Sequence, residues 1–305
     1  MLRRRHLLAG LGAAAAGTAL AGSAYALAIE PGFLLDVRRY RPALPAWPEG
    51  FHLRIGVIAD LHAGGPHMLP RRVEAIAEAV AGLRPDLVVF LGDLNASHRF
   101  LTERVPPARS AAILARLRPP LGVHAVLGNH DWWDDPAAMR GDRRHRPETE
   151  LALRAAGIPV LENAAVRLRH DGRDFWLAGL GSMWAFGGRM GRWRGVDDLP
   201  ATLAATAADD APAILLAHEP DIFPRVPGRV ALTLSGHTHG GQVRLPGVPL
   251  VVPSNFGDRY AHGHIVESGR HLIVSSGLGT SGYPVRFGVP PEIVLVELGQ
   301  AAGAG

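Results

Sequence analysis

Five short hydrophobic runs along the chain each stop directly before residues of metal-binding type. The runs are Leu53–Ile58, Leu87–Leu91, Val123–Leu127, Ile214–Leu216 and Val230–Leu234. Apolar runs of this length, bounded by glycine and polar residues, are typical of strands that are covered on both faces. Because strand ends on one edge of such a sheet form the crevice where ligands bind, we predict that the residues after the runs lie together.

Amphipathic helical patterns separate the strands, as in βαβ units with a mostly parallel sheet. They cover Pro70–Leu83, Ala108–Leu117 and Glu148–Ala156. Further on, two strand patterns flank Asp171-Gly172, which predicts a hairpin of Val166–Arg169 with Phe175–Leu180. A helix is expected over Leu199–Ala208, and strands over Gln242–Leu245, His271–Ser275 and Ile293–Leu298. We therefore predict one α/β domain of two packed sheets with helices outside, over residues 51–299, and a flexible tail over 300–305.

The N-terminal segment has a different composition. Residues 1–30 begin with Arg3-Arg4-Arg5 and continue as an Ala/Gly/Leu-rich stretch, which predicts an export signal resembling the twin-arginine type or an N-terminal membrane anchor. Ala-x-Ala patterns between Ala24 and Ala28 offer cleavage points, and the uncleaved stretch is just long enough to span a bilayer. Either way, we expect the body outside the cytoplasmic membrane, in the periplasm or on the outer face. A buried alanine-rich helix is the alternative, and residues 31–50, with four prolines, are expected to be a linker.

The composition limits which partners and which metal ligands the protein is expected to have. The 305 residues are 47% hydrophobic and 20% charged, as in a globular protein, and the net charge of +4 comes from arginines scattered among acidic residues. No nucleic-acid motif accompanies this charge, so nucleic acid is not the expected partner. There is no cysteine, which excludes disulfides and thiolate ligands, so oxygen and nitrogen must hold any metal.

The polar residues after the hydrophobic runs are carboxylates, an amide and imidazoles. In chain order they are Asp60, His62, Asp93, Asn129, His218, His237 and His239. Alternation along an extended chain sends Asp60 and His62 to the same side, so both can bind one ion. Seven ligands exceed one tetrahedral site and suit two adjacent ions with a shared carboxylate. Each motif alone has a structural interpretation, as a turn, a helix cap or a core histidine. Their conjunction favours a metal centre.

These motifs also carry a family resemblance. Asp60-Leu61-His62, Gly92-Asp93, Gly128-Asn129-His130-Asp131, His218 and Gly236-His237-Thr238-His239 resemble the full signature of the calcineurin-like metallophosphoesterases. Ala217–Pro220, Gly277–Gly282 and Arg286–Gly288 resemble its small bacterial exported or membrane-associated phosphodiesterase branch. The resemblance implies a four-layer αββα sandwich of two mixed β-sheets flanked by helices, and two divalent metal ions. Mn, Fe and Zn all accept these ligands.

Carried over by position, the resemblance implies that Asp60, His62 and His239 hold one ion and that Asn129, His218 and His237 hold the other. Asp93 would bridge the two ions. One departure is the sequence Leu94-Asn95 after Gly92-Asp93, where the family commonly has a Val-Asp or Val-Asn ending. That ending is not a ligand, so the departure concerns the local loop.

The expected activity is hydrolysis of a phosphodiester, or less readily a phosphomonoester, by in-line attack of a hydroxide that bridges the ions. His130 would stabilise phosphoryl charge or protonate the leaving group, with Asp131 orienting its ring. Arg286 is a candidate contact to substrate phosphate, and Trp132 and Trp133 line a pocket or lie in the core. The substrate stays open, with envelope lipids or polymers favoured if the body is exported. The alternatives are a non-catalytic envelope protein on the same fold, and a metal carrier or sensor.

Overall fold

The computed structural model describes residues 17–140, 145–186, 194–246 and 248–299. The first 16 residues of the predicted signal or anchor, and the predicted tail at 300–305, lie outside this part of the chain. Within it, the predicted strands and helices are present with ends shifted by a few residues.

One sheet has five strands in the order β1-β13-β2-β3-β4. Neighbouring strands are parallel except for β13 and β2, which are antiparallel, so the sheet is mixed. Its strands are β1 (Asp36–Tyr40), β13 (Glu292–Leu298), β2 (Leu53–Ile58), β3 (Leu87–Phe90) and β4 (Val123–Ala125).

The other sheet has six strands in the order β11-β12-β8-β7-β6-β5 and is also mixed. β12, β8, β7 and β6 are parallel, while β11 and β5 are antiparallel edge strands. The predicted hairpin is confirmed as β5 and β6, which pair across Asp171-Gly172. The strands are β11 (Gly263–Glu267), β12 (Arg270–Val274), β8 (Val230–Ser235), β7 (Ala213–Leu216), β6 (Arg173–Gly179) and β5 (Ala164–His170).

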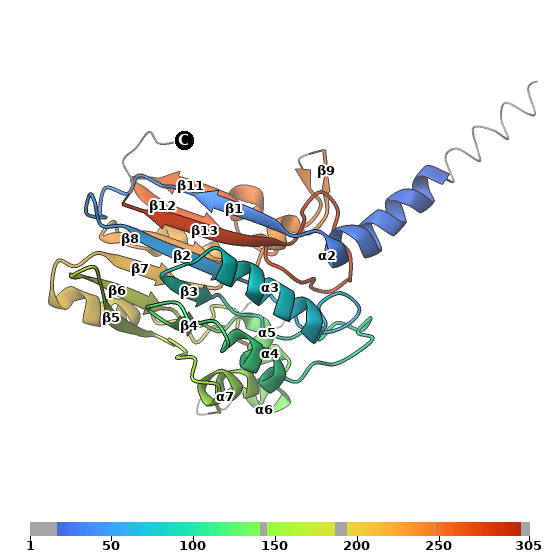
Figure 1. The fold of residues 1–305 in the computed structure, drawn as a ribbon, viewed down its shortest axis with the longest axis horizontal. Coiled ribbons are helices and arrows are strands. Elements are labelled where there is room, and N and C mark those ends of the chain that lie inside the picture. Colours follow the sequence, from blue (N-terminus) through green and yellow to red (C-terminus); the bar gives the residue numbers. More distant parts are fainter. Residues whose placement is uncertain (1–16, 141–144, 187–193, 247, 300–305) are drawn as a thin grey trace, which may run out of the picture.

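Three hydrophobic cores define four layers (Figure 1). The middle core lies between the sheets and takes alternate side chains of their strands, such as Ile55 and Val57 from β2 and Ile214 and Leu216 from β7. The opposite faces of the same strands contribute to the two outer cores, because successive side chains on a strand point to opposite faces. Both sheets are therefore covered on both faces, which explains their continuous apolar runs.

Helices cover the outer faces. The five-stranded sheet is covered by α3 (Pro70–Gly82), α4 (Pro107–Leu114) and α7 (Glu148–Ala155), whose apolar residues join its outer core. The six-stranded sheet is covered by α8 (Leu199–Ala204), η3 (Ala205–Ala208), η4 (Pro220–Arg225) and η6 (Gly257–Tyr260). The predicted four-layer αββα sandwich is confirmed. Short elements near the strand ends are α5 (Asn129–Trp133), α6 (Pro136–Met139), η5 (His239–Gly241) and the β9 (Arg244–Leu245) and β10 (Val248–Pro249) hairpin.

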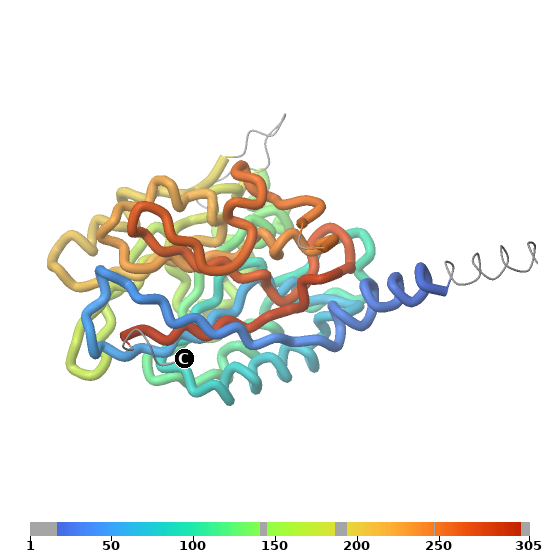
Figure 2. Tube along the Cα trace, turned by 90° about the horizontal axis from the view of Figure 1, so that it is seen from above, coloured from blue at the N-terminus to red at the C-terminus, as the bar shows by residue number. Residues whose placement is uncertain are grey.

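The structure differs from expectation around the predicted linker. Residues Asp36–Tyr40 within it form β1, which pairs with β13 at the edge of the five-stranded sheet. Residues 17–33 are helical, through η1 (Tyr25–Ile29) and α2 (Glu30–Phe33), and project from one end of the body (Figures 1 and 2). Glu30 is buried and accepts hydrogen bonds from the backbone N–H groups of Gly288 and Val289. Among the described residues, no helix combines the length and apolarity needed to cross a membrane.

Candidate metal centre

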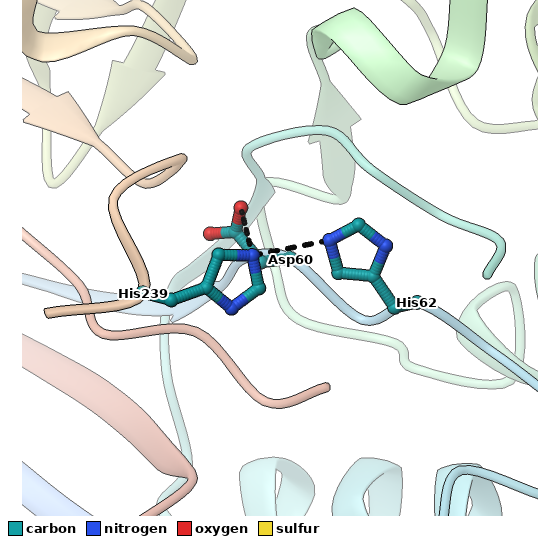
Figure 3. Close-up of side chains that lie close together, drawn as sticks. All are labelled: Asp60, His62 and His239. Carbon is teal, nitrogen blue, oxygen red and sulfur yellow. Dashed lines mark hydrogen bonds and ion pairs between the residues drawn. The ribbon is translucent and has the colours of Figure 1, made fainter. Parts of the chain in front are cut away.

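Asp60, His62 and His239 form the first cluster of potential ligands (Figure 3). Asp60 and His62 follow β2, and His239 follows β8, so the two sheets deliver them to one edge of the sandwich. The Nε2 atoms of His62 and His239 lie 3.1 Å apart, and Nε2 of His239 lies 3.6 Å from Oδ1 of Asp60. All three side chains are buried.

Asp93, His218 and His237 form the second cluster, and they follow β3, β7 and β8. Nε2 of His218 lies 3.3 Å from Oδ2 of Asp93 and 3.3 Å from Nδ1 of His237. The amide oxygen of Asn129, at the start of α5, lies 3.2 Å from the same Nε2. The structure thus brings together all seven side chains that the sequence pointed to.

Asp93 lies between the two clusters. Its Oδ2 is 3.5 Å from Nε2 of His62 in the first cluster and 3.3 Å from Nε2 of His218 in the second. Its Oδ1 accepts a hydrogen bond from the backbone N–H of His130. One carboxylate therefore faces both clusters, as a bridging ligand requires.

The atoms in this space fit divalent cations. His218 donates from Nδ1 to the carbonyl of Leu91, at 2.6 Å, so its Nε2 is the ring atom left to bind a cation or a proton. Nε2 faces a carboxylate oxygen, an amide oxygen and another imidazole nitrogen. Buried acceptors that face one another repel unless a cation or proton lies between them. Oxygen and imidazole donors of this kind suit Mn, Fe and Zn, and the carbonyl partner of His218 holds its ring as second partners of metal-binding histidines do.

The electrostatics agree with a cation site. Burial lowers the pKa of His62 to about 3, and lowers the pKa of both His237 and His239 well below the usual value, so these rings are in the neutral form that binds metal. Burial also raises the pKa of Asp60 to about 7, a cost that a bound cation would offset. Burial alone would lower the pKa of His218, but Asp93 raises it well above its usual value, so a positive charge is favoured between these two side chains.

The backbone explains how the ligands converge, and it corrects the alternation argument. Asp60 and His62 have φ of 49° and 42°, and His237 and His239 have φ of 70° and 51°. None of the four is extended; each lies in the left-handed region. The pairs converge because tight turns follow the strands, and the backbone N–H of His237 donates to both carboxylate oxygens of Asp60.

His130 lies next to both clusters and belongs to neither. Its ring is 5.0 Å from the ring of His62, and its Nε2 is 3.1 Å from the hydroxyl of Ser281. Its Nδ1 is 3.4 Å from the hydroxyl of Ser97 and 3.7 Å from Oδ2 of Asp134. Burial would lower the pKa of His130, but the carboxylates of Asp93 and Asp134 raise it.

The predicted role of Asp131 does not fit its position. Its Oδ2 accepts hydrogen bonds from the backbone N–H groups of Asp93 and Gly128, both at 2.8 Å, and its Oδ1 accepts one from Leu94 at 3.0 Å. Asp131 therefore ties the turn that carries Asp93 to the turn that carries Asn129. The carboxylate beside the ring of His130 is that of Asp134, one helical turn along, because residues i and i+4 share a helix face.

Comparison with known proteins places this centre in a family. The model of the calcineurin-like phosphoesterases matches residues 53–266, which include all seven potential ligands. The chain belongs to the calcineurin-like phosphoesterase family.

Three of its relatives match over most of both chains. An uncharacterized metallophosphoesterase of Aquifex aeolicus is 30% identical over 269 residues, which are 87% of this chain and 92% of that protein. The uncharacterized metallophosphoesterase YkuE of Bacillus subtilis is 30% identical, over 98% of both chains. The phosphodiesterase YaeI of Escherichia coli is 30% identical, over 98% of this chain and 100% of that protein.

In this metallophosphoesterase, the position of Arg286 does not fit the predicted contact with substrate phosphate. Its side chain is fully buried, and its guanidinium donates to the carbonyls of Ser276, Gly279 and Val289. One of its nitrogens lies 3.3 Å from Nδ1 of His239. Arg286 therefore holds the loop behind the metal centre.

A cavity of about 360 Å³ lies beside the centre and includes His62 and His130, but not Arg286, in its lining. Sequence reasoning missed Arg99, Ser281 and Tyr283 in this lining. The exposed guanidinium of Arg99 lies over the rings of Phe100 and Tyr283. Arg99 follows Asp93 on the same loop, so an arginine shortly after a ligand turn was the signal available. Of the two tryptophans, Trp132 is buried in the core, and Trp133 packs edge-on against His130.

Proposed function

We propose that this metallophosphoesterase hydrolyses phosphodiesters, in preference to phosphomonoesters, at a centre of two divalent metal ions. The observation that carries the proposal is the position of His130, a histidine outside both ligand clusters that faces an open cavity beside them. The relative YaeI, a phosphodiesterase by name, supports the same class of reaction.

Asp60, His62 and His239 would hold one ion, Asn129, His218 and His237 the other, and Asp93 both. Bound there, two such ions supply Lewis acidity toward water and positive charge toward the phosphoryl oxygens. Mn, Fe or Zn fits this donor set. The carboxylate of Asp131 accepts a hydrogen bond from the backbone of Asp93, and the carbonyl of Leu91 accepts one from His218. The backbone N–H of His237 donates to Asp60, so these contacts hold the ligands in position.

His130 would donate a proton to the departing alkoxide. The carboxylates of Asp93 and Asp134 raise the pKa of His130, which favours the protonated ring. Its Nε2 points toward Ser281 in the cavity wall, where a leaving oxygen would lie. General acid catalysis of this kind contributes about a hundredfold to ten-thousandfold in rate.

The charge and the volume of the cavity beside His130 are the two features that favour diesters over monoesters. A phosphodiester carries one negative charge at neutral pH, whereas a phosphomonoester carries up to two. The lining of the cavity offers one arginine, Arg99, and three histidines, and its other residues are hydroxyl residues and glycine. Its volume of about 360 Å³ accommodates an organic group on the leaving side.

We also propose that the protein is exported, with residues 1–30 as a twin-arginine-type signal or a retained anchor. The support is the sequence of that segment, Arg4-Arg5 followed by an uncharged stretch. In cell fractionation, the Arg4→Lys/Arg5→Lys variant should stay inside the cytoplasmic membrane while the unaltered protein is found outside it. Equal distribution of both would overturn the export proposal.

The hydrolase proposal is tested with purified protein loaded separately with Mn, Fe or Zn. Bis(p-nitrophenyl) phosphate should be turned over faster than p-nitrophenyl phosphate. His130→Ala should keep two bound ions per chain and lose about a hundredfold in kcat. His98→Ala is the matched control, because His98 lines the same cavity and is a member of neither cluster. Absence of turnover with every metal and ester would favour the non-catalytic binding protein instead.

A further inference from the structure

Large aliphatic side chains are exposed on the β9–β10 hairpin and the residues after it. The exposed fractions are 48% for Leu245, 64% for Val248, 59% for Leu250 and 74% for Val251. Single exposed aliphatic residues are ordinary, but several on one projecting hairpin mark an interaction surface. We call these four residues the hairpin patch.

A cavity of about 390 Å³ lies directly behind the hairpin patch. Leu250 and Val251 form its outer wall, and Val243, Pro253 and Val285 make the rest of the lining mainly apolar. His239, a ligand of the first cluster, lies in the same lining. An apolar groove therefore runs up to the metal centre.

This groove and the cavity that contains His130 adjoin each other. Ser281 and Tyr283 line both of them, so these residues form the shared wall. His62 lines the cavity with His130, and His239 lines the groove, with 3.1 Å between their Nε2 atoms. A phosphodiester at the metal centre would thus have one ester arm beside His130 and the other in the groove.

The hairpin patch continues onto the N-terminal helix. The backbone N–H of Arg244, at the start of the hairpin, donates to the carbonyl of Phe287, whose ring meets that of Tyr25 edge-on at 6.0 Å. The helix also exposes Leu27 and Phe33. Both views place the helix and the hairpin at the same end of the molecule (Figures 1 and 2). A flat apolar partner could touch both at once.

The charge beside the groove also fits an amphiphile. Arg99 lines the cavity next to the shared wall, and its guanidinium donates to the hydroxyl of Tyr283. Apolar residues at the outside and an arginine with metal ligands at the inside match a molecule with a hydrocarbon chain and an anionic phosphate.

From these contacts we propose that the substrate is a lipid phosphodiester taken from a bilayer, with its hydrocarbon chain in the groove and the hairpin patch in the bilayer surface. The inference rests on the proposed phosphodiesterase function, which it narrows to one substrate class. The proposal assigns the hairpin patch to lipid, so binding of a protein partner or of a second copy of this chain at the patch would contradict it.

The groove is tested with alkyl phosphocholines of increasing chain length, which are soluble phosphodiesters. Because each buried methylene contributes about fourfold in affinity, kcat/KM should rise about fourfold per methylene until the groove is filled. Val285→Trp, which fills the groove, should flatten this dependence while metal content is kept. No rise with chain length in the unaltered protein would overturn the groove assignment.

Binding measurements distinguish failure of the groove assignment from failure of the phosphodiesterase proposal. Titration calorimetry on the His130→Ala variant with the same alkyl phosphocholines measures affinity without depending on turnover. If binding to this variant strengthens with chain length but the unaltered protein hydrolyses no ester, the groove assignment stands and the hydrolase proposal is overturned. If the unaltered protein hydrolyses esters but affinity does not depend on chain length, the hydrolase proposal stands and the groove assignment is overturned.

The hairpin patch is tested by sedimentation with vesicles of phosphatidylcholine and phosphatidylglycerol. The Leu245→Ser/Val248→Ser variant should bind at least about tenfold more weakly than the unaltered protein. Leu151→Ser is the matched control, since Leu151 is similarly exposed, at 53%, but lies on α7 away from the hairpin. Equal binding by both variants would overturn the proposal. Failure to bind vesicles together with a dimer in solution, lost in the double variant, would assign the patch to a second copy.

Discussion

Replacing Asp131 or Asp134 by alanine separates two interpretations of the carboxylates around His130. In the structure, Asp131 binds three backbone N–H groups and does not contact His130, while Asp134 lies 3.7 Å from its Nδ1. Asp131→Ala should therefore reduce stability and metal binding. Asp134→Ala should instead change the pH dependence of catalysis.

The magnitude for Asp131→Ala follows from its hydrogen bonds. Three buried N–H groups lose their acceptor, at about 2 kcal/mol each, or about 6 kcal/mol in all. Burial and the neighbouring charge of Asp93 raise the pKa of Asp131 to about 6, so removal of this carboxylate also removes part of its cost of burial. The expected net loss in the free energy of unfolding is therefore positive and below about 6 kcal/mol. Urea denaturation at pH 8 measures it, and metal analysis should show fewer than two bound ions.

Asp134→Ala should cost under about 1 kcal/mol, since its side chain is 28% exposed and ion pairs of this kind are weak. Because Asp134 raises the pKa of His130, its loss should move the alkaline limb of the kcat profile to lower pH. A shift of one pH unit reduces the protonated fraction about tenfold above the pKa. If Asp131→Ala shifted the kcat profile at full stability, and Asp134→Ala did nothing, the geometric reasoning would be refuted.

Three further predictions concern other parts of the molecule. In Gly128→Ala, the new Cβ would overlap Oδ1 of Asp93, so metal analysis should show loss of ions from a protein that still folds by circular dichroism. Glu30→Ala leaves two N–H groups without acceptors and should lower the urea midpoint, at a cost of about 2 kcal/mol; an unchanged midpoint would contradict the docking of the N-terminal helix. Burial raises the pKa of Glu162 from 4.5 to about 7, so the folded state keeps a proton that the unfolded state releases, and stability falls as pH rises from about 4.5 to 7. Glu162→Gln should therefore stabilise by about 1–2 kcal/mol at pH 8 and not at pH 4, as measured by urea denaturation at the two pH values.

The strands covered on both faces were predictable because burial on two sides demands a continuous apolar run. In the two large sheets, the two strands that were missed are edge strands. β1 contains Asp36 and two arginines and is largely exposed, and β11 alternates between half-buried and exposed positions. Their pairing with β13 and β12 depends on strands distant in the chain or on a tight turn, and local hydrophobicity carries little of that information.

The site residues were also predictable only in part. The identities of the ligands were readable because few residue types bind metal. The roles of Asp131 and Arg286 were not, because each depends on which backbone groups lie opposite in space. Asp134 was within reach of sequence reasoning, since it lies four residues after His130 in a helical pattern.

The left-handed turns connect the ligand types with the backbone that carries them. Five of the seven potential ligands have positive φ: Asp60, His62, Asp93, His237 and His239. Residues other than glycine pay about 1–2 kcal/mol for this conformation, and aspartate and histidine tolerate it better than most. Residue types that bind metal are thus also types that accept such turns, so one choice of residue serves both needs. The strain persists because backbone hydrogen bonds hold each turn, as from His62 N–H to the carbonyl of Asp93 and from Asp93 N–H to Asp131. The Asp-x-His spacing therefore marks a strained turn after a buried strand, and the ligands it presents are preorganised for metal.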